Sequence, residues 1–181
     1  MVQLFTAIGM DTGYSSPYED LHENCNAGME RHLHQPDAPY IVKSPAMCDY
    51  LKRILDSGEV VVDHAIVPMR EIYAAAESRR DVERRTPSDF PGGVSGGLWP
   101  LTAPEAQETV LAEKFYNLMY VLTCHDVPHT LLHFPLMIRD PEYLFCKLRG
   151  VLPKGSRREF LDAHRTLARP EIIHDFRKPQ P

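Results

Sequence analysis

Two residues of the sequence have the types and the spacing of an anion-binding pair. Arg70 follows directly after the apolar run 60–69, and Ser78 lies eight residues further on, in a stretch rich in alanine and glutamate. About two turns of helix span this separation, and both side chains donate hydrogen bonds to anionic oxygens. A surface salt bridge and a solvated hydroxyl explain the same pattern about as well, so the spacing alone leaves both interpretations open.

A second candidate is the run Lys43-Ser44-Pro45, which follows the apolar residues Ile41 and Val42. A lysine where a strand ends can stabilise negative charge that develops on a transferred group, so Lys43 is a candidate catalytic residue. The same run is also typical of a helix start, with Ser44 as the cap and Pro45 at the first helical position. The structural and functional roles are compatible, and Ser44 is a candidate substrate contact.

The glycine-rich segment 92–99 carries the only tryptophan, Trp99. It does not qualify as a phosphate-binding loop, because no strand precedes it and no Lys-Ser pair ends it. Two interpretations remain for this segment. One is a lid or acceptor loop anchored by Trp99, and the other is a plain flexible connection.

Metal chemistry is not predicted. His125, His129 and His133 have helical spacing, but Pro128 interrupts a helix at that point. The four cysteines are scattered and form no C-x-x-C pair, so neither a zinc site nor a redox motif is visible.

The helices and strands that position these residues can be predicted from the hydrophobic pattern of the sequence. It predicts strands at 39–43, 60–68 and 130–136 and helices at 1–8, 46–55, 70–85, 104–123, 141–149 and 157–167. Asp140 and Thr102 are the expected caps of two of these helices. A strand, a helix and a strand over 39–68 form a parallel crossover, so the fold class is α/β with a parallel sheet flanked by helices. The polar stretch 11–37 is expected to be a long loop.

Composition bounds the broad class of the protein. A chain of 181 residues with 43% hydrophobic and 25% charged residues indicates a folded protein, with one domain over 1–168 and a polar tail over 169–181. The net charge of −5 argues against a general nucleic-acid binder. No apolar run approaches the roughly 20 residues of a membrane helix and no signal segment is seen, so a cytoplasmic location without membrane contact is expected.

Taken together, the motifs resemble the P-loop sulfotransferases, which use 3′-phosphoadenosine-5′-phosphosulfate. In that family a strand-end arginine and a serine eight residues later hold the 3′-phosphate, which is similar to Arg70 and Ser78. The run Lys43-Ser44-Pro45 is similar to a segment of the carbohydrate-directed members, and HFPLMIRDPEYLFCKLRGVLP is similar to the penultimate strand and helix. The resemblance spans about residues 4–167 and implies a three-layer P-loop-like fold.

The resemblance also implies further roles. Arg79, close to the serine, would support the nucleotide, and the polar loop with His22, His32 and His34 would approach the acceptor. His22 is therefore a candidate general base, with a solvated loop histidine as the competing interpretation.

One part of the family pattern is missing from the sequence. No glycine-rich phosphosulfate loop of the form G-x-x-x-S-G-[ST] occurs before residue 92, and residues 1–8 resemble the helix that would follow it. We expect the first strand and its loop to be missing, whether by truncation, by a misplaced start codon or by loss. Two exposed strand edges and a groove would result, which favours a homodimer or other partner chain at the exposed edge.

Two functions of different classes follow. The first is sulfuryl transfer from 3′-phosphoadenosine-5′-phosphosulfate to a hydroxyl or amine of a small-molecule or carbohydrate acceptor, with activity doubtful for want of the phosphate loop. The second is a non-catalytic remnant or protein-interaction module on the same fold. A small-molecule kinase ranks last, because no Walker lysine is present.

Overall fold

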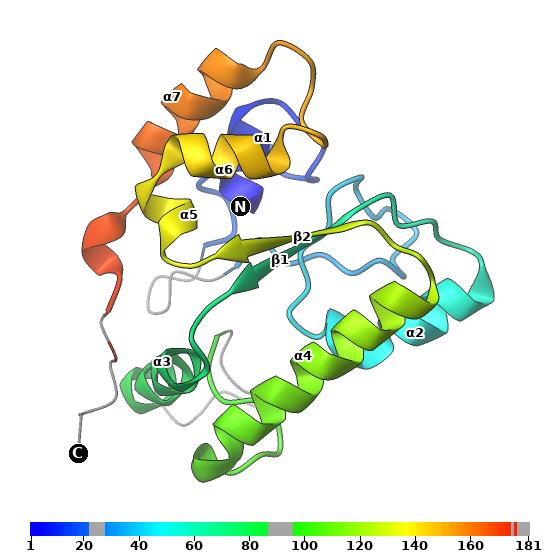
Figure 1. Ribbon diagram of the computed structural model, residues 1–181, viewed down its shortest axis with the longest axis vertical. Coiled ribbons are helices and arrows are strands. Elements are labelled where there is room, and N and C mark those ends of the chain that lie inside the picture. Colours follow the sequence, from blue (N-terminus) through cyan, green and yellow to red (C-terminus); the bar gives the residue numbers. More distant parts are fainter. Residues whose placement is uncertain (22–27, 87–95, 175, 177–181) are drawn as a thin grey trace.

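The computed structural model describes residues 1–21, 28–86, 96–174 and 176 (Figure 1). These residues form a mixed α/β structure with one parallel sheet of two strands. The elements, in chain order, are α1 (Val2–Ala7), α2 (Met47–Ser57), β1 (Ala65–Met69), α3 (Ile72–Arg85), the 3-10 helix η1 (Pro104–Ala106), α4 (Gln107–Cys124), β2 (His129–His133), α5 (Leu136–Arg139), α6 (Pro141–Leu148), α7 (Arg157–Leu167) and the 3-10 helix η2 (Pro170–Ile172).

The sheet joins two segments that lie far apart in the sequence. Strands β1 and β2 run parallel, with Ala65 opposite His129 and Met69 opposite His133. Hydrogen bonds from the Ala65 N–H to the Pro128 carbonyl and from the Phe134 N–H to the Met69 carbonyl lie at the two ends of the ladder. Both strands therefore end at the same edge of the molecule, where Arg70 follows β1.

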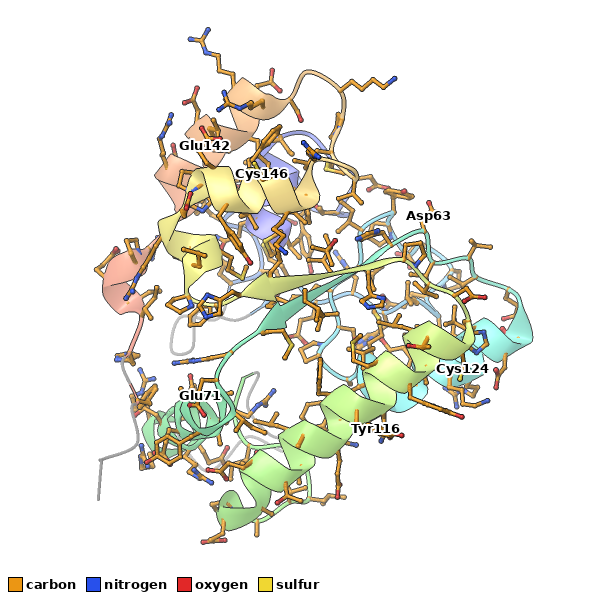
Figure 2. The ribbon with its side chains drawn as sticks, viewed as in Figure 1. Asp63, Glu71, Tyr116, Cys124, Glu142 and Cys146 are labelled. Carbon is orange, nitrogen blue, oxygen red and sulfur yellow. The ribbon has the colours of Figure 1, made fainter. Side chains whose placement is uncertain are left out.

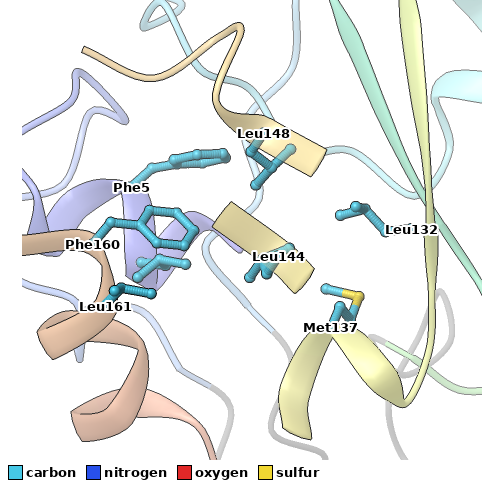
Figure 3. Packing of buried hydrophobic residues seen from close by; sticks show 8 residues of the cluster. Phe5, Leu132, Met137, Leu144, Leu148, Phe160 and Leu161 are labelled. Atoms are coloured by element: carbon cyan, nitrogen blue, oxygen red, sulfur yellow. The ribbon is translucent and has the colours of Figure 1, made fainter. Parts of the chain in front are cut away.

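Helices cover both faces of this sheet (Figure 1). On one face, Leu132 of β2 packs against α1 and α5–α7, and Figure 3 shows this cluster around Phe160 and Leu144. On the other face, Val67 of β1 packs against the cluster that α2 and α4 form around Leu51 and Leu122. Side chains of a strand alternate between faces, so a strand of five residues serves both cores.

Local sequence signals explain where several helices begin and end. The Asp140 side chain accepts a hydrogen bond from the Tyr143 N–H at 2.9 Å, with Pro141 at the first helical position of α6, as predicted. Helix α2 ends at Gly58, whose φ of 71° is readily adopted only by glycine. The predicted Thr102 cap is wrong, because its hydroxyl donates to the Trp99 carbonyl and accepts from the Gln107 side chain.

The strand predicted at 39–43 does not form, and neither does the crossover that depends on it. The backbone of this segment bonds to the polar stretch before it instead. The Ile41 N–H donates to the Asp11 carbonyl at 2.9 Å, and the Lys43 carbonyl accepts from the Arg31 N–H at 3.0 Å. The strand predicted at 60–68 is shortened to β1, and the one predicted at 130–136 ends at His133. Hydrophobic periodicity does not reveal which neighbour satisfies a backbone group.

Both outer edges of the sheet carry features that hinder further strand pairing. Alternate residues of a parallel strand bond to opposite sides, so Ile66 and Pro68 present their backbone to the free edge of β1. Pro68 has no N–H to offer there. On the outer edge of β2, the His133 N–H donates to the Tyr143 hydroxyl at 2.9 Å.

Candidate functional site

Arg70 and Ser78 are placed by the turn from β1 into α3. Glu71 begins the helix, because its side chain accepts hydrogen bonds from the Tyr73 and Ala74 N–H groups, and Figure 2 shows Glu71 at this turn. The stretch that follows has no glycine or proline up to Arg85, so it continues as helix through Ser78. The predicted strand-end arginine and helical serine are therefore both present.

The structure brings these two side chains to one cavity. Arg70 and Ser78 both line a cavity of about 380 Å³, which we call the Arg70 cavity. Its other polar lining residues are mostly basic, and they are Gln3, Arg85, His164, Arg169 and His174. Arg85 is paired with Asp81, whereas Arg70 and Arg169 add two further guanidinium groups, and this excess of positive charge favours a ligand that carries negative charge.

Arg70 sits between two aromatic rings. Its guanidinium lies 4.9 Å from the ring centroid of Phe134 and 5.6 Å from that of Phe176, and it donates to the His174 carbonyl at 3.2 Å. Burial lowers the pKa of Arg70 from its usual value, although an arginine stays charged throughout the physiological range. Among the described residues, no carboxylate forms an ion pair with Arg70. Its charge is available to an anion.

Lys43, Ser44 and Trp99 line a second, larger cavity of about 1750 Å³, which we call the β1 cavity because it follows residues 59–68. Both cavities are lined by Met1, Gln3, Leu21, Phe134 and Met137. The two groups of predicted site residues therefore occupy neighbouring cavities rather than one. Their shared wall is made of mainly apolar side chains.

Lys43 is held against the preceding loop. Its Nζ donates to the Gly28 carbonyl at 2.7 Å and lies 3.3 Å from a carboxylate oxygen of Glu30. An ammonium group has three donor hydrogens, so one remains for a ligand in the β1 cavity. The pairing with Glu30 was not found from the sequence. The two residues are 13 positions apart in irregular chain, and no periodicity relates them.

Ser44 belongs to a group of hydroxyl and imidazole side chains. Its Oγ lies 3.3 Å from Nδ1 of His32, and the Tyr50 hydroxyl lies 3.5 Å from the same nitrogen. The His32 ring stacks on His34, with ring centroids 5.4 Å apart, and meets the Tyr50 ring edge-on at 6.3 Å. Burial raises the pKa of Tyr50, so its hydroxyl stays protonated at neutral pH.

Arg79 points away from the Arg70 cavity. It donates to the Gly97 carbonyl at 2.6 Å, and its guanidinium lies 5.2 Å from the Trp99 ring centroid. The Lys114 ammonium lies at the same distance from that ring and forms an ion pair with Asp49. In this structure Arg79 therefore holds Trp99 in place, and its expected support of a nucleotide remains a prediction.

Some predicted features lie outside the described residues. These are His22 and residues 92–95 of the glycine-rich segment. Over the described ranges, no group of three or more histidine, cysteine, aspartate or glutamate side chains is arranged to hold a metal ion. The same ranges contain no helix that is both long and apolar enough to cross a membrane.

The expected tail contributes to the site, which the sequence did not reveal. Arg169, Ile172 and His174 line the Arg70 cavity, and the His174 carbonyl accepts from Arg70. A polar, proline-containing stretch gives no hydrophobic period from which such packing is predicted.

Known proteins add nothing to this geometry. Comparison with protein-family models, with curated proteins and with solved structures finds no match. The functional argument therefore depends on the residues themselves.

Proposed function

We propose that this chain is a sulfotransferase-like protein that binds 3′-phosphoadenosine-5′-phosphosulfate, with the 3′-phosphate held by Arg70 and Ser78. One observation carries the proposal: a strand-end arginine and a helical serine eight residues later line the same cavity. The cavity also holds Arg85 and Arg169, so its donors suit a phosphate group. Its volume lies in the range of small-molecule sites.

The proposed fold is a P-loop-like three-layer arrangement around a parallel sheet. The parallel pairing of β1 and β2 and the helices on both faces support this proposal. In open sheets of this kind, ligands bind beyond the carboxyl ends of the strands, where Arg70 lies. The donors of a phosphosulfate loop are missing from the sequence, so the fit concerns the 3′-phosphate end of the nucleotide.

The nucleotide would supply the activated sulfuryl group, and the protein would position it and stabilise charge. By analogy with phosphoryl transfer, little covalent work is needed. Lys43, with one donor hydrogen free of Gly28 and Glu30, would stabilise charge on the transferred group. A hydroxyl or amine acceptor would lie in the β1 cavity, which Lys43 and Ser44 line.

Calorimetric titration with adenosine 3′,5′-bisphosphate tests this proposal. We expect Arg70→Ala to weaken binding by tenfold or more, because a charge-assisted hydrogen bond contributes about 1.5–3 kcal/mol. Arg84→Ala is the matched control, since Arg84 lies on the same helix and pairs with Asp81 outside the cavity. The 2′,5′ isomer should bind less tightly.

Equal affinity of the Arg70→Ala variant, or no binding by the unmodified chain, would contradict the assignment. The alternative, an interaction module that pairs through its sheet edge or forms a homodimer there, has less support. Pro68 and Tyr143 hinder pairing at the two edges.

A further inference from the structure

The side chains around Ser44 are suited to a second kind of chemistry, which sulfuryl transfer does not use. A serine becomes a nucleophile when a neighbouring base takes its proton, and hydrogen-bond reach between the two is the geometric requirement. The distance of 3.3 Å from Ser44 Oγ to His32 Nδ1 is close to this reach, and such contacts are often looser without a ligand.

The base is held in place by its neighbours. The His32 ring contacts the stacked ring of His34 and the edge of the Tyr50 ring, which also contact each other, so two aromatic contacts fix its orientation. The backbone N–H of His32 also donates a hydrogen bond to the Gln35 side chain at 3.2 Å, which further restrains the residue. A base with a fixed ring keeps Nδ1 directed at the serine, which is the role of the third group in catalytic triads.

The surroundings of Ser44 are electropositive. Ser44 lies three residues before the first residue of α2, an eleven-residue helix whose N-terminal end carries partial positive charge. Lys43 precedes it and lines the same cavity. Both features favour an oxyanion near Ser44, such as the one that forms when a hydroxyl attacks an ester carbonyl.

The cavity beside Ser44 indicates the substrate class. Apolar side chains form much of its wall, including Met47, Leu51, Val62, Leu118 and Leu122. Polar side chains also line the cavity, among them Gln3, Gln35, Asp63, His64 and Lys114. An alkyl chain is stabilised by about 0.8 kcal/mol for each CH₂ group buried on such a wall.

We propose that Ser44 and His32 form a nucleophile–base pair that hydrolyses carboxylic esters with apolar acyl groups. Ser44 Oγ attacks the carbonyl carbon while His32 takes the hydroxyl proton. The bond to the alcohol oxygen then breaks, and His32 returns the proton to the departing alcohol. Water attacks the acyl-serine in the same way, which releases the carboxylic acid and restores Ser44. Ester and water are consumed, and acid and alcohol are formed.

Hydrolysis of p-nitrophenyl octanoate by the full chain tests the pair. We expect Ser44→Ala and His32→Gln each to lower the rate by tenfold or more, and a fluorophosphonate probe to label Ser44. His125→Gln and Ser57→Ala are matched controls: His125 pairs with Asp56, Ser57 bonds to the Ile54 carbonyl, and neither residue lines the β1 cavity.

The proposal is overturned if the unmodified chain gives no rate above buffer, if Ser44→Ala keeps the rate, or if the probe labels another residue. The acetate ester should react more slowly than the octanoate, and the reverse order would contradict the apolar acyl site. Binding of adenosine 3′,5′-bisphosphate to Ser44→Ala checks its fold. Since that binding depends on Arg70, failure of the ester chemistry leaves the proposed function untouched.

Discussion

Gly28 holds the loop that anchors Lys43, and its replacement by alanine should be costly. Its φ of 127° is a conformation that residues with a side chain rarely adopt. A Cβ built at Gly28 would lie 2.0 Å from the Asp20 carbonyl oxygen and 3.1 Å from the Leu21 Cα. These neighbours are backbone atoms, so the two chain segments joined by the Leu21–Gly28 bridge must move apart.

The cost has two parts. Backbone strain at such a position is about 1–3 kcal/mol. Separation of the segments also weakens the hydrogen bond from the Met29 N–H to the Asp20 carbonyl and the one from Lys43 Nζ to the Gly28 carbonyl, at about 1 kcal/mol each. We expect Gly28→Ala to lower the free energy of unfolding by about 3–5 kcal/mol.

Gly58→Ala provides the comparison. Gly58 also has a positive φ, of 71°, but a Cβ there would meet nothing within 4 Å. Its replacement should cost only the conformational part, about 1–2 kcal/mol. Urea unfolding of both variants, analysed at a common slope, measures the difference. If Gly28→Ala is no more destabilising than Gly58→Ala, the close approach of the two segments is refuted.

Two further predictions concern the core and a half-buried thiol. Leu132 of β2 is fully buried against helices α5 and α6, so Leu132→Ala should lower the free energy of unfolding by about 2–5 kcal/mol. The neighbouring Leu131 side chain is 40% exposed, so Leu131→Ala should lower it by about 1 kcal/mol or less. Urea unfolding measures both, and equal losses would contradict the placement of β2. Burial raises the pKa of Cys48 to about 11, so its reactive thiolate is scarce until the pH approaches that value. Iodoacetamide at pH 8 should therefore modify the exposed Cys124 and Cys146 well before Cys48, and mass spectrometry of the peptides would show any reversal.

Much of the local structure could be predicted from the sequence, because helices carry their own signals. The predicted 157–167 helix is α7, and the cap and proline at Asp140 and Pro141 begin α6 as expected. A strand depends on hydrogen bonds to a partner segment, and its own sequence does not identify that segment. Residues 39–43 have the composition of a strand, yet their hydrogen bonds go to Asp11 and Arg31, which lie in a stretch without any period.

The candidate site shows the same difference between local features, which could be predicted, and long-range contacts, which could not. The pair Arg70 and Ser78 could be placed together because one turn and one helix connect them. Contacts between separate loops could not be predicted, such as Lys43 with Glu30 or Arg70 with the His174 carbonyl. Arg79 illustrates the limit, since the resemblance gave it a role beside Ser78 but could not show that its side chain reaches Trp99.

Trp99 is the only indole in the chain, and it lines the β1 cavity between two cations. The tryptophan emission of the intact protein therefore originates at a single place, on the wall where an acceptor or an acyl chain would lie. Any molecule that enters there changes the polarity around one fluorophore. The unmodified protein thus carries its own optical reporter for occupancy of this cavity, and the Arg70 cavity, which Trp99 does not line, contributes only indirectly to the signal.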